Sequence, residues 1–351
     1  MQACDTYARQ PRSTVRAVLV QQHGNRIWER RYPHQDRDLH WGSGTAAPLF
    51  GEHYRVAHTP SARQNVKSVT KSVLSLLVGI AHERGLFDLD RPVAVYLPEV
   101  MSLARDERAA TITPRHLLQM SSGFEWIENG EVTLRWINSP EPLAFTAQQP
   151  MVADPGSQYR YSTADTHLLS VCLSSVLPTD LLDWANDALF GPLGFRADQW
   201  LRDNSGNPIG GSELFLSARE MATIGQLVLD DGRHDGRQLV GREWIELTTA
   251  PQSFDPDLLA PRDPLTGQLV QSPPGVRLHR DGYGWLWWLT DFHGIPAVMA
   301  QGYGGQLIVV LRKLEAVVVI QRATNPPPDD EPDLPAEEML DEFIVPTLLA
   351  R

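Results

Sequence analysis

The chain has 351 residues, 42% of them hydrophobic, so it can bury one large core or two lobes that share a cleft. Its formal net charge of -12 and its isoelectric point near 5.4 argue against a nucleic-acid-binding protein, because such proteins concentrate basic charge on one face. Only Lys67, Lys71 and Lys313 are lysines among the 31 basic residues, so a lysine inside a motif is informative here.

The cysteines and the apolar segments give indications of the cellular compartment of the protein. Cys4 and Cys172 are too few for a disulfide framework or a four-thiolate zinc site, and we expect both to be free thiols. The start of the chain lacks the apolar core of a secretory signal, and nowhere do about 18 apolar residues run together. We therefore expect no membrane association and a cytoplasmic protein, or a periplasmic or secreted one if a leader was removed.

The first half of the chain passes from strand patterns to helical patterns. Residues 16–22 and 26–32 are β-type runs around the turn residues His23-Gly24-Asn25, which predicts an N-terminal hairpin. Apolar residues then recur at helical spacing from Ser68 to His82, and Gly85 follows as a stop, so a helix is predicted to open at Ser68. Further helical patterns occupy 114–121, 164–176, 179–189 and 217–230.

Strand patterns return late, with the spacing of an antiparallel meander, at 283–290, 296–301, 306–312 and 315–321. Pro326-Pro327-Pro328 predicts an exposed linker before a closing helix at 336–350. Weak periodicity over 127–150 predicts a loop above the site.

We therefore expect one α+β domain over residues 1–351. Its α/β lobe would comprise about 1–67 and 240–351, with an antiparallel sheet flanked by helices, and 68–239 would form a mostly helical lobe. The active site is expected in the cleft between the two lobes.

The first candidate for chemistry is the pair Ser68 and Lys71. A serine hydroxyl needs a base to become a nucleophile, and a lysine three residues later on a helix lies on the same face. A position at the helix start adds backbone N–H groups and the positive end of the helix dipole, which suit an oxyanion and depress the pKa of the lysine. The alternative is a helix-capping serine beside a solvated lysine, and the pair alone leaves both interpretations open.

Two later segments could complete such a site. In Tyr159-Arg160-Tyr161-Ser162-Thr163, the phenol of Tyr161 could carry a proton beside a lysine, although a core tyrosine is the alternative. In Gly302-Tyr303-Gly304-Gly305-Gln306, glycines at a strand edge allow close approach of a ligand. The N–H of Gln306 could pair with that of Ser68 as an oxyanion hole, and a plain turn between strands is the alternative.

These motifs, in this order, resemble the serine β-lactamase and penicillin-binding-protein superfamily. Within it the chain resembles the class C-like branch of 6-aminohexanoate-dimer hydrolases and family VIII-type esterases. The resemblance runs through SVTKSVLSLLVGIAHERGLFDLDRPVAVYLPE (68–99), ITPRHLLQMSSGFEW (112–126), PGSQYRYSTADTHLLS (155–170), residues 210–232 and AQGYGGQLIVV (300–310). It implies a β-lactamase/transpeptidase-like fold.

The resemblance also implies roles for single residues. Ser68 would be the nucleophile, Lys71 its base and Tyr161 the proton relay, with the N–H groups of Ser68 and Gln306 as the oxyanion hole. Thr163, which we expect to bind substrate, stands where the penicillin-recognising pattern has asparagine, and it resembles the Tyr-x-Ser variant of the oligoamide hydrolases.

At a second position the chain also departs from the penicillin-recognising pattern. Tyr303-Gly304-Gly305 stands where that pattern has Lys-Thr-Gly or His-x-Gly. The usual cation facing a substrate carboxylate is therefore missing, which argues against efficient β-lactam hydrolysis. Arg262 or Arg280 could replace this cation, but no spacing favours either.

Tryptophans near the expected cleft could line an apolar acyl pocket, with Trp126 as a substrate-binding candidate and Trp136, Trp285, Trp287 and Trp288 nearby. On a strand, Trp285 and Trp287 would share one face and Trp288 would occupy the other, so at least one belongs to the core.

Other polar residues receive structural interpretations. We expect Asp165 to cap the following helix and His167 to pack or to lie on its surface; the alternative is that they support the catalytic residues from behind. The possible ligands in 34–40 (HQDRDLH) are expected to form a solvated loop. No metal and no cofactor are predicted.

The leading hypothesis is a serine hydrolase that cleaves carboxylic esters or small linear amides through an acyl-enzyme on Ser68. One alternative is a non-catalytic binding or sensor protein with this fold, since a fold does not establish a function. The other is a D-amino-acid peptidase or weak β-lactamase. The expected partner is a small-molecule ester or amide. The chain leaves open the physiological substrate and whether the protein forms an oligomer.

Overall fold

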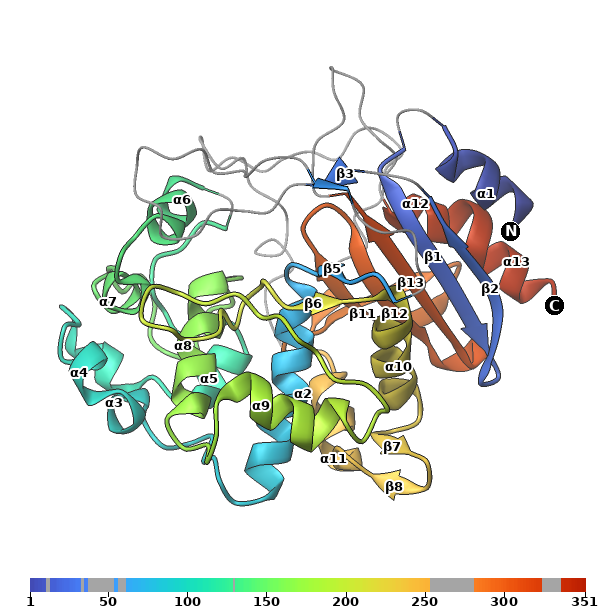
Figure 1. Cartoon of the computed structure of the whole chain (residues 1–351). Coiled ribbons are helices and arrows are strands. Elements are labelled where there is room, and N and C mark those ends of the chain that lie inside the picture. The colour runs from blue at the N-terminus through green and yellow to red at the C-terminus, as the bar shows by residue number, and fades with distance from the viewer. Residues whose placement is uncertain are drawn as a thin grey trace.

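A seven-stranded antiparallel sheet dominates one side of the protein, as the computed structural model shows (Figure 1). Its strand order is β2-β1-β13-β12-β11-β10-β9, so the N-terminal hairpin pairs with the last strand of the chain. This arrangement confirms an α+β fold whose sheet is split in sequence by a helical insertion. The structure describes residues 1–10, 13–32, 35–36, 54–55, 61–128, 130–252, 281–323 and 336–351.

The large sheet and three short ladders contain all strands of the described residues. The sheet consists of β1 (Val15–Gln22), β2 (Asn25–Arg31), β9 (Gly282–Tyr283), β10 (Trp288–Phe292), β11 (Ile295–Gly302), β12 (Gln306–Leu311) and β13 (Ala316–Arg322). The ladders pair β3 (Gln35–Asp36) with β4 (Tyr54–Arg55), β5 (Gln64–Asn65) with β6 (Phe215–Leu216), and β7 (Arg233–His234) with β8 (Arg237–Gln238).

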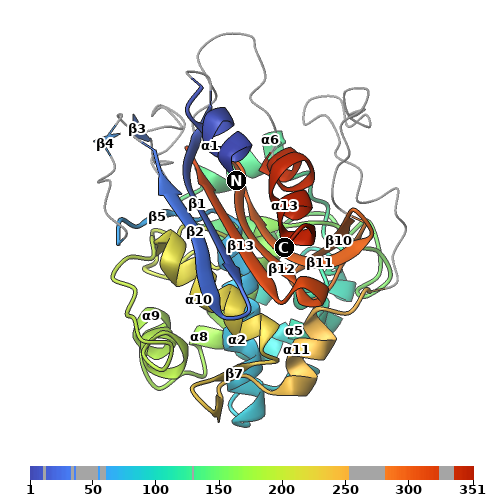
Figure 2. The same ribbon diagram turned by 90° about the vertical axis from the view of Figure 1, so that its right-hand side faces the viewer.

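Helices cover both faces of the sheet. On one face α10 (Ala218–Leu229) packs against β1, β12 and β13. On the other face lie α1 (Gln2–Ala8) and the C-terminal helices α12 (Ala336–Met339) and α13 (Val345–Leu349), joined by a π-helical turn at Leu340–Ile344 (Figure 2). Because both faces are covered, β12 and β13 are buried along their whole length and read as continuous apolar runs.

Helix α2 (Val69–Glu83) lies between the sheet and the remaining helices. It contacts β11 and β12 on one side and α8 (Thr163–Ser174) on the other, and its residues are buried from Val69 to Ala81. The other helices are α3 (Val93–Tyr96), α4 (Pro98–Met101), α5 (Pro114–Leu118), α6 (Glu131–Ile137), α7 (Pro142–Ala147), α9 (Leu181–Ala185) and α11 (Arg242–Thr248), with short 3-10 or π turns at Glu107–Thr111, Asn186–Phe190 and Arg312–Leu314.

Three expectations about these elements need correction. Segment 127–150 is not a plain loop, because it contains α6 and α7, which begin beside Gly130 and at Pro142. The predicted strand 283–290 is broken after Tyr283, since Leu286 adopts a positive φ of 67°. Helix α10 packs on the sheet, although it falls within residues 68–239, which were expected to form the helical lobe.

Among the described residues, no helix has the length and apolar character needed to cross a bilayer. Cys4 and Cys172 are buried free thiols, as expected.

Candidate active site

Ser68 lies at the N-terminus of α2, where the sequence analysis expects the helix to open. It is the N-cap residue, but its side chain makes no capping hydrogen bond. Instead its Oγ lies at hydrogen-bond distance, 3.0 Å, from Lys71 Nζ. Ser68 is partly exposed, so its hydroxyl combines a basic neighbour with access from outside. This geometry contradicts the interpretation of Ser68 as an ordinary helix cap.

Lys71 is buried, with 1% of its surface exposed, so it is not a solvated surface charge. Besides Ser68, its Nζ contacts Thr163 Oγ1 at 2.8 Å and the carbonyl oxygen of Gly211 at 2.7 Å. Burial lowers the pKa of Lys71 to about 8, although the negative charges of Glu128 and Glu213 act in the opposite direction. A substantial fraction of Lys71 is therefore neutral near pH 8 and able to accept a proton.

Tyr161 lies beside Lys71, directly before Ser162, the N-cap of α8. Lys71 Nζ lies 5.0 Å from the centroid of the Tyr161 ring. The ring stacks on Trp288 at a centroid separation of 5.4 Å and meets Tyr283 edge-on at 5.9 Å. These aromatic contacts hold the partly exposed Tyr161 ring beside the lysine.

The glycine-rich hairpin reaches the nucleophile through Gly302. A Cβ atom on Gly302 would lie 2.3 Å from the carbonyl oxygen of Val66, two residues before Ser68. Gln306 lies on the second strand of the hairpin, opposite Gly302. Its side chain is fully buried, where it accepts from Gln64 Nε2 and donates to the carbonyl oxygen of Arg322.

The position of Gln306 argues against its predicted part in an oxyanion hole. The carbonyl group of Gly302 accepts from Gly305 N and therefore points toward β12. Because the peptide bond is trans, the N–H of Tyr303 points the opposite way, away from β12. β10 pairs with β11 only up to Met299, so it does not cover this edge. We therefore propose the N–H of Tyr303, in place of that of Gln306, as the partner of the N–H of Ser68.

Thr163 and Trp126, both predicted to bind substrate, have other contacts in the structure. The Thr163 hydroxyl contacts Lys71 Nζ and Glu128 Oε1, and the residue is 5% exposed. Trp126 is 3% exposed, its ring meets Trp136 edge-on and its Nε1 donates to Glu128 Oε2 at 2.6 Å. Trp126 thus supports Glu128 from within the protein. In contrast, Tyr303 is 51% exposed at the hairpin tip, open to a ligand.

Sequence analysis missed Glu128, which joins Trp126 to Thr163. The residue lies in the segment that was expected to be a loop, two positions after a tryptophan already singled out. Its carboxylate accepts from the backbone N–H of Thr163 at 3.0 Å as well as from the Thr163 hydroxyl at 2.5 Å. No motif marks an acidic residue for this role, because the contact depends on how the segment before α6 folds back over α8.

A second missed feature is a buried ion pair beside the nucleophile. Lys67 Nζ lies 3.5 Å from Glu213 Oε1, and both side chains are almost fully buried. Asn65 donates its side-chain amide to the same carboxylate and accepts the backbone N–H of Lys67 through Oδ1 at 2.9 Å. These contacts fix the backbone just before Ser68, where Lys67 has a φ of 51°.

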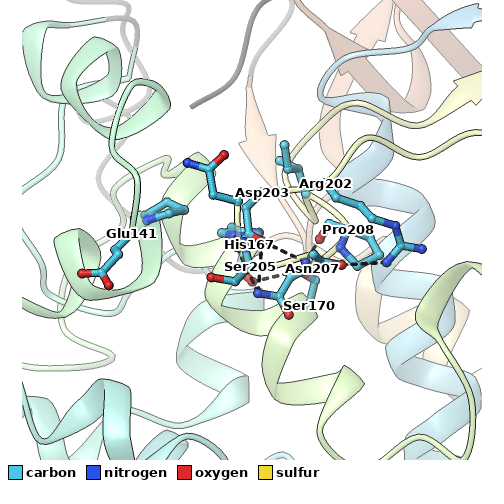
Figure 3. A network of polar contacts seen from close by, with 12 residues as sticks. Glu141, His167, Ser170, Arg202, Asp203, Ser205, Asn207 and Pro208 are labelled. Atoms are coloured by element: carbon cyan, nitrogen blue, oxygen red, sulfur yellow. Dashed lines mark hydrogen bonds and ion pairs between the residues drawn. The ribbon is translucent and has the colours of Figure 1, made fainter. Parts of the chain in front are cut away.

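Gly211 and Glu213 belong to a loop that is anchored on α8. Figure 3 shows the anchor, in which the buried His167 contacts Asp203 Oδ2 through Nε2 at 3.1 Å, while Asn207 donates to the same carboxylate. Burial of Asp203 disfavours its charge, but the bonds from His167 and Asn207 dominate and lower its pKa to about 2. His167 is thus a buried residue that acts at a distance from Ser68 by holding the loop.

Asp165 does not cap α8, contrary to expectation, because Ser162 occupies the N-cap and accepts the N–H of Asp165. The Asp165 carboxyl group is 1% exposed and accepts a hydrogen bond from Ser122 Oγ at 3.0 Å. Burial raises its pKa to about 7, against the opposing effect of the hydrogen bonds from Ser122 and Ser162.

Metal ligands do not cluster in the part of the chain that the structure describes, where no group of three or more His, Cys, Asp or Glu residues could hold an ion. The side chains of 34–40, together with Arg262 and Arg280, lie outside the described residues.

Comparisons with known proteins identify the family of this chain. The chain is 23% identical over 300 residues to the 6-aminohexanoate-dimer hydrolase of Paenarthrobacter ureafaciens, and this match covers 80% of this chain and 71% of the relative. It is 30% identical over 142 residues to esterase EstB of Burkholderia gladioli, covering 37% of this chain and 36% of the relative. A D-stereospecific amidohydrolase from Streptomyces has the same fold, with a TM-score of 0.64 at 15% identity over 97% of each chain. The beta-lactamase family matches residues 12–340, and the chain therefore belongs to the beta-lactamase family of serine hydrolases.

Proposed function

We propose that this protein hydrolyses carboxylic esters or small linear amides through an acyl-enzyme on Ser68. The observation that carries the proposal is the contact between Ser68 Oγ and Lys71 Nζ, because the lysine is buried and its pKa is lowered to about 8. A neutral amine at hydrogen-bond distance is the base that a serine nucleophile needs. The relatives named above include one amide hydrolase and one esterase, which supports this substrate class.

The proposed reaction has two halves, acylation and deacylation of Ser68. In acylation, Lys71 takes the proton from Ser68 Oγ, which attacks the substrate carbonyl carbon, and the N–H groups of Ser68 and Tyr303 bind the resulting oxyanion. Tyr161 passes the proton on to the departing alcohol or amine, and an ester bond to Ser68 Oγ remains. In deacylation, water gives a proton to the same base, attacks the ester and releases the carboxylic acid, so that Ser68 recovers its proton.

A fluorophosphonate probe tests the nucleophile, because it bonds covalently to activated serines. We expect one adduct on the peptide that contains Ser68, measured by mass spectrometry, and none in the Ser68→Ala variant. Turnover of esters should vanish in the same variant, while its thermal unfolding stays unchanged.

Two outcomes of this experiment would contradict the proposal. An unlabelled but folded wild-type protein would favour a non-catalytic binding protein with this fold. Activity that survives in Ser68→Ala would remove Ser68 from the mechanism altogether.

A further inference from the structure

The contacts of Glu128 determine in which direction the hydrogen bonds around Lys71 run. An ionised carboxylate only accepts hydrogen bonds, so the Thr163 hydroxyl must donate its one proton to Glu128 Oε1. The second carboxylate oxygen accepts from Trp126 Nε1 and from the backbone N–H of Thr163, which fixes the carboxylate in place. Toward Lys71 the same hydroxyl is left to act as an acceptor.

The direction of the Thr163 hydroxyl determines which hydrogen bonds neutral Lys71 donates. Neutral Lys71 has two N–H bonds and one lone pair. One N–H points to Thr163 Oγ1, and the other points to the carbonyl oxygen of Gly211, which can only accept. The lone pair is then left for the third neighbour, Ser68 Oγ, at 3.0 Å. Without Glu128 the Thr163 hydroxyl could turn and donate to Lys71, and the lone pair would be engaged away from the nucleophile.

We propose that Glu128 is a positioning residue that acts through Thr163 to aim the lone pair of Lys71 at Ser68. The proposal rests on the hydrolytic function proposed above and adds a fourth member to its machinery. Glu128 acts on the base as the third group of a catalytic triad acts, although it reaches the base through a hydroxyl.

Charge gives Glu128 a second, measurable effect on Lys71. Its carboxylate and that of Glu213 both favour the charged lysine, and burial opposes them. The carboxylate of Glu213 already contacts Lys67 and Asn65. The other acidic group near Glu128 is Asp165. Removal of the negative charge at Glu128 should therefore make Lys71 less basic and move the acid limb of the rate profile to lower pH.

The test compares Glu128→Gln with Glu125→Gln, which removes the same charge from an exposed side chain three residues away. For Glu128→Gln we expect kcat on an ester to fall on the order of 10- to 100-fold at the plateau, with KM little changed. The acid limb of kcat/KM should move to lower pH at the same time. Glu125→Gln should match the wild type in both respects, because exposed charges are screened by solvent.

Two substitutions at Thr163 test the same path if Glu128→Gln fails to fold. Thr163→Ser keeps the hydroxyl and should retain most activity, whereas Thr163→Val should lose about as much kcat as Glu128→Gln. Wild-type kcat and an unmoved acid limb in Glu128→Gln, or equal rates in the two Thr163 variants, would overturn the inference. If the wild type itself formed no Ser68 adduct, the proposed function would fail instead, so the two failures are distinguishable.

Discussion

Gly302→Ala is the sharpest test of how the hairpin is held against the nucleophile. The added Cβ would lie 2.3 Å from the carbonyl oxygen of Val66 and 3.1 Å from Lys67 Cβ. Ordinary van der Waals contacts begin at 3.4 Å, so the contact with Val66 would be about 1 Å too short and the contact with Lys67 slightly too short. Neither neighbour can turn away, since one is a backbone atom and the other a Cβ atom. The backbone of Gly302 has a conformation open to alanine, so the strain is steric and must move β11 away from Ser68.

A displacement of this size at the oxyanion site should be costly. A misplacement of about 1 Å commonly lowers a rate on the order of 100-fold, and we expect kcat for ester hydrolysis to fall by about that factor. The rate of fluorophosphonate labelling should fall with it, because the phosphonyl oxygen uses the same N–H groups.

Gly282→Ala serves as the matched control for this experiment. It adds a methyl group in the same sheet at an ordinary 3.5 Å from Leu289 Cβ, so its kcat should stay near wild type. Thermal unfolding of both variants would show whether the fold persists. A folded Gly302→Ala protein with kcat within twofold of wild type would refute the close approach of the hairpin to the nucleophile.

Three further predictions concern the ionisable groups. Lys71→Ala should lower kcat/KM by roughly 1000-fold or more, since base and nucleophile act as a unit, and a loss below tenfold would indicate another base. In the wild type the acid limb of kcat/KM should lie near pH 8. Tyr161→Phe should slow amide hydrolysis more than ester hydrolysis in parallel kinetic assays, because an amine needs a proton to leave, and equal losses would exclude the relay. The folded protein binds the Asp165 proton more tightly than the unfolded chain does, so stability is lost as pH rises from about 4 to about 7, by up to roughly 4 kcal/mol. Asp165→Asn removes this loss of stability. Measured by urea unfolding, the variant's free energy of unfolding minus that of the wild type should therefore be larger at pH 8 than at pH 5. An equal difference at the two pH values would contradict a buried, protonated Asp165.

Local patterns were sufficient to predict most strands of the sheet and the helix that begins at Ser68. The helix at Ser68 follows from apolar residues at helical spacing, and the distance between Ser68 and Lys71 then follows from helix geometry. The strands of the late meander are apolar enough to be recognised without any knowledge of their partners. These features depend on residues close together in sequence, which explains why they could be predicted.

The features that sequence reasoning missed depend on contacts between distant segments. Glu128 reaches Lys71 only because Thr163 lies between them, 35 positions after Glu128 in the chain. The preference for Tyr303 over Gln306 depends on which way one carbonyl group of the hairpin points. A glycine-rich segment indicates a close approach, but its composition does not say which N–H faces the nucleophile.

Some departures from ordinary folding preferences lie close to Ser68, and they favour an enzyme over a binding protein. Lys67 and Glu213 are non-glycine residues with φ of 51° and 73°, and such conformations cost about 1 to 3 kcal/mol each. Lys71 adds a buried amine whose charged form is disfavoured, although an apolar residue would pack there without that cost. A protein that only bound a ligand beside Ser68 would gain nothing from a base at 3.0 Å from a partly exposed serine. A hydrolase needs that base to be neutral near physiological pH, and burial is what makes it so.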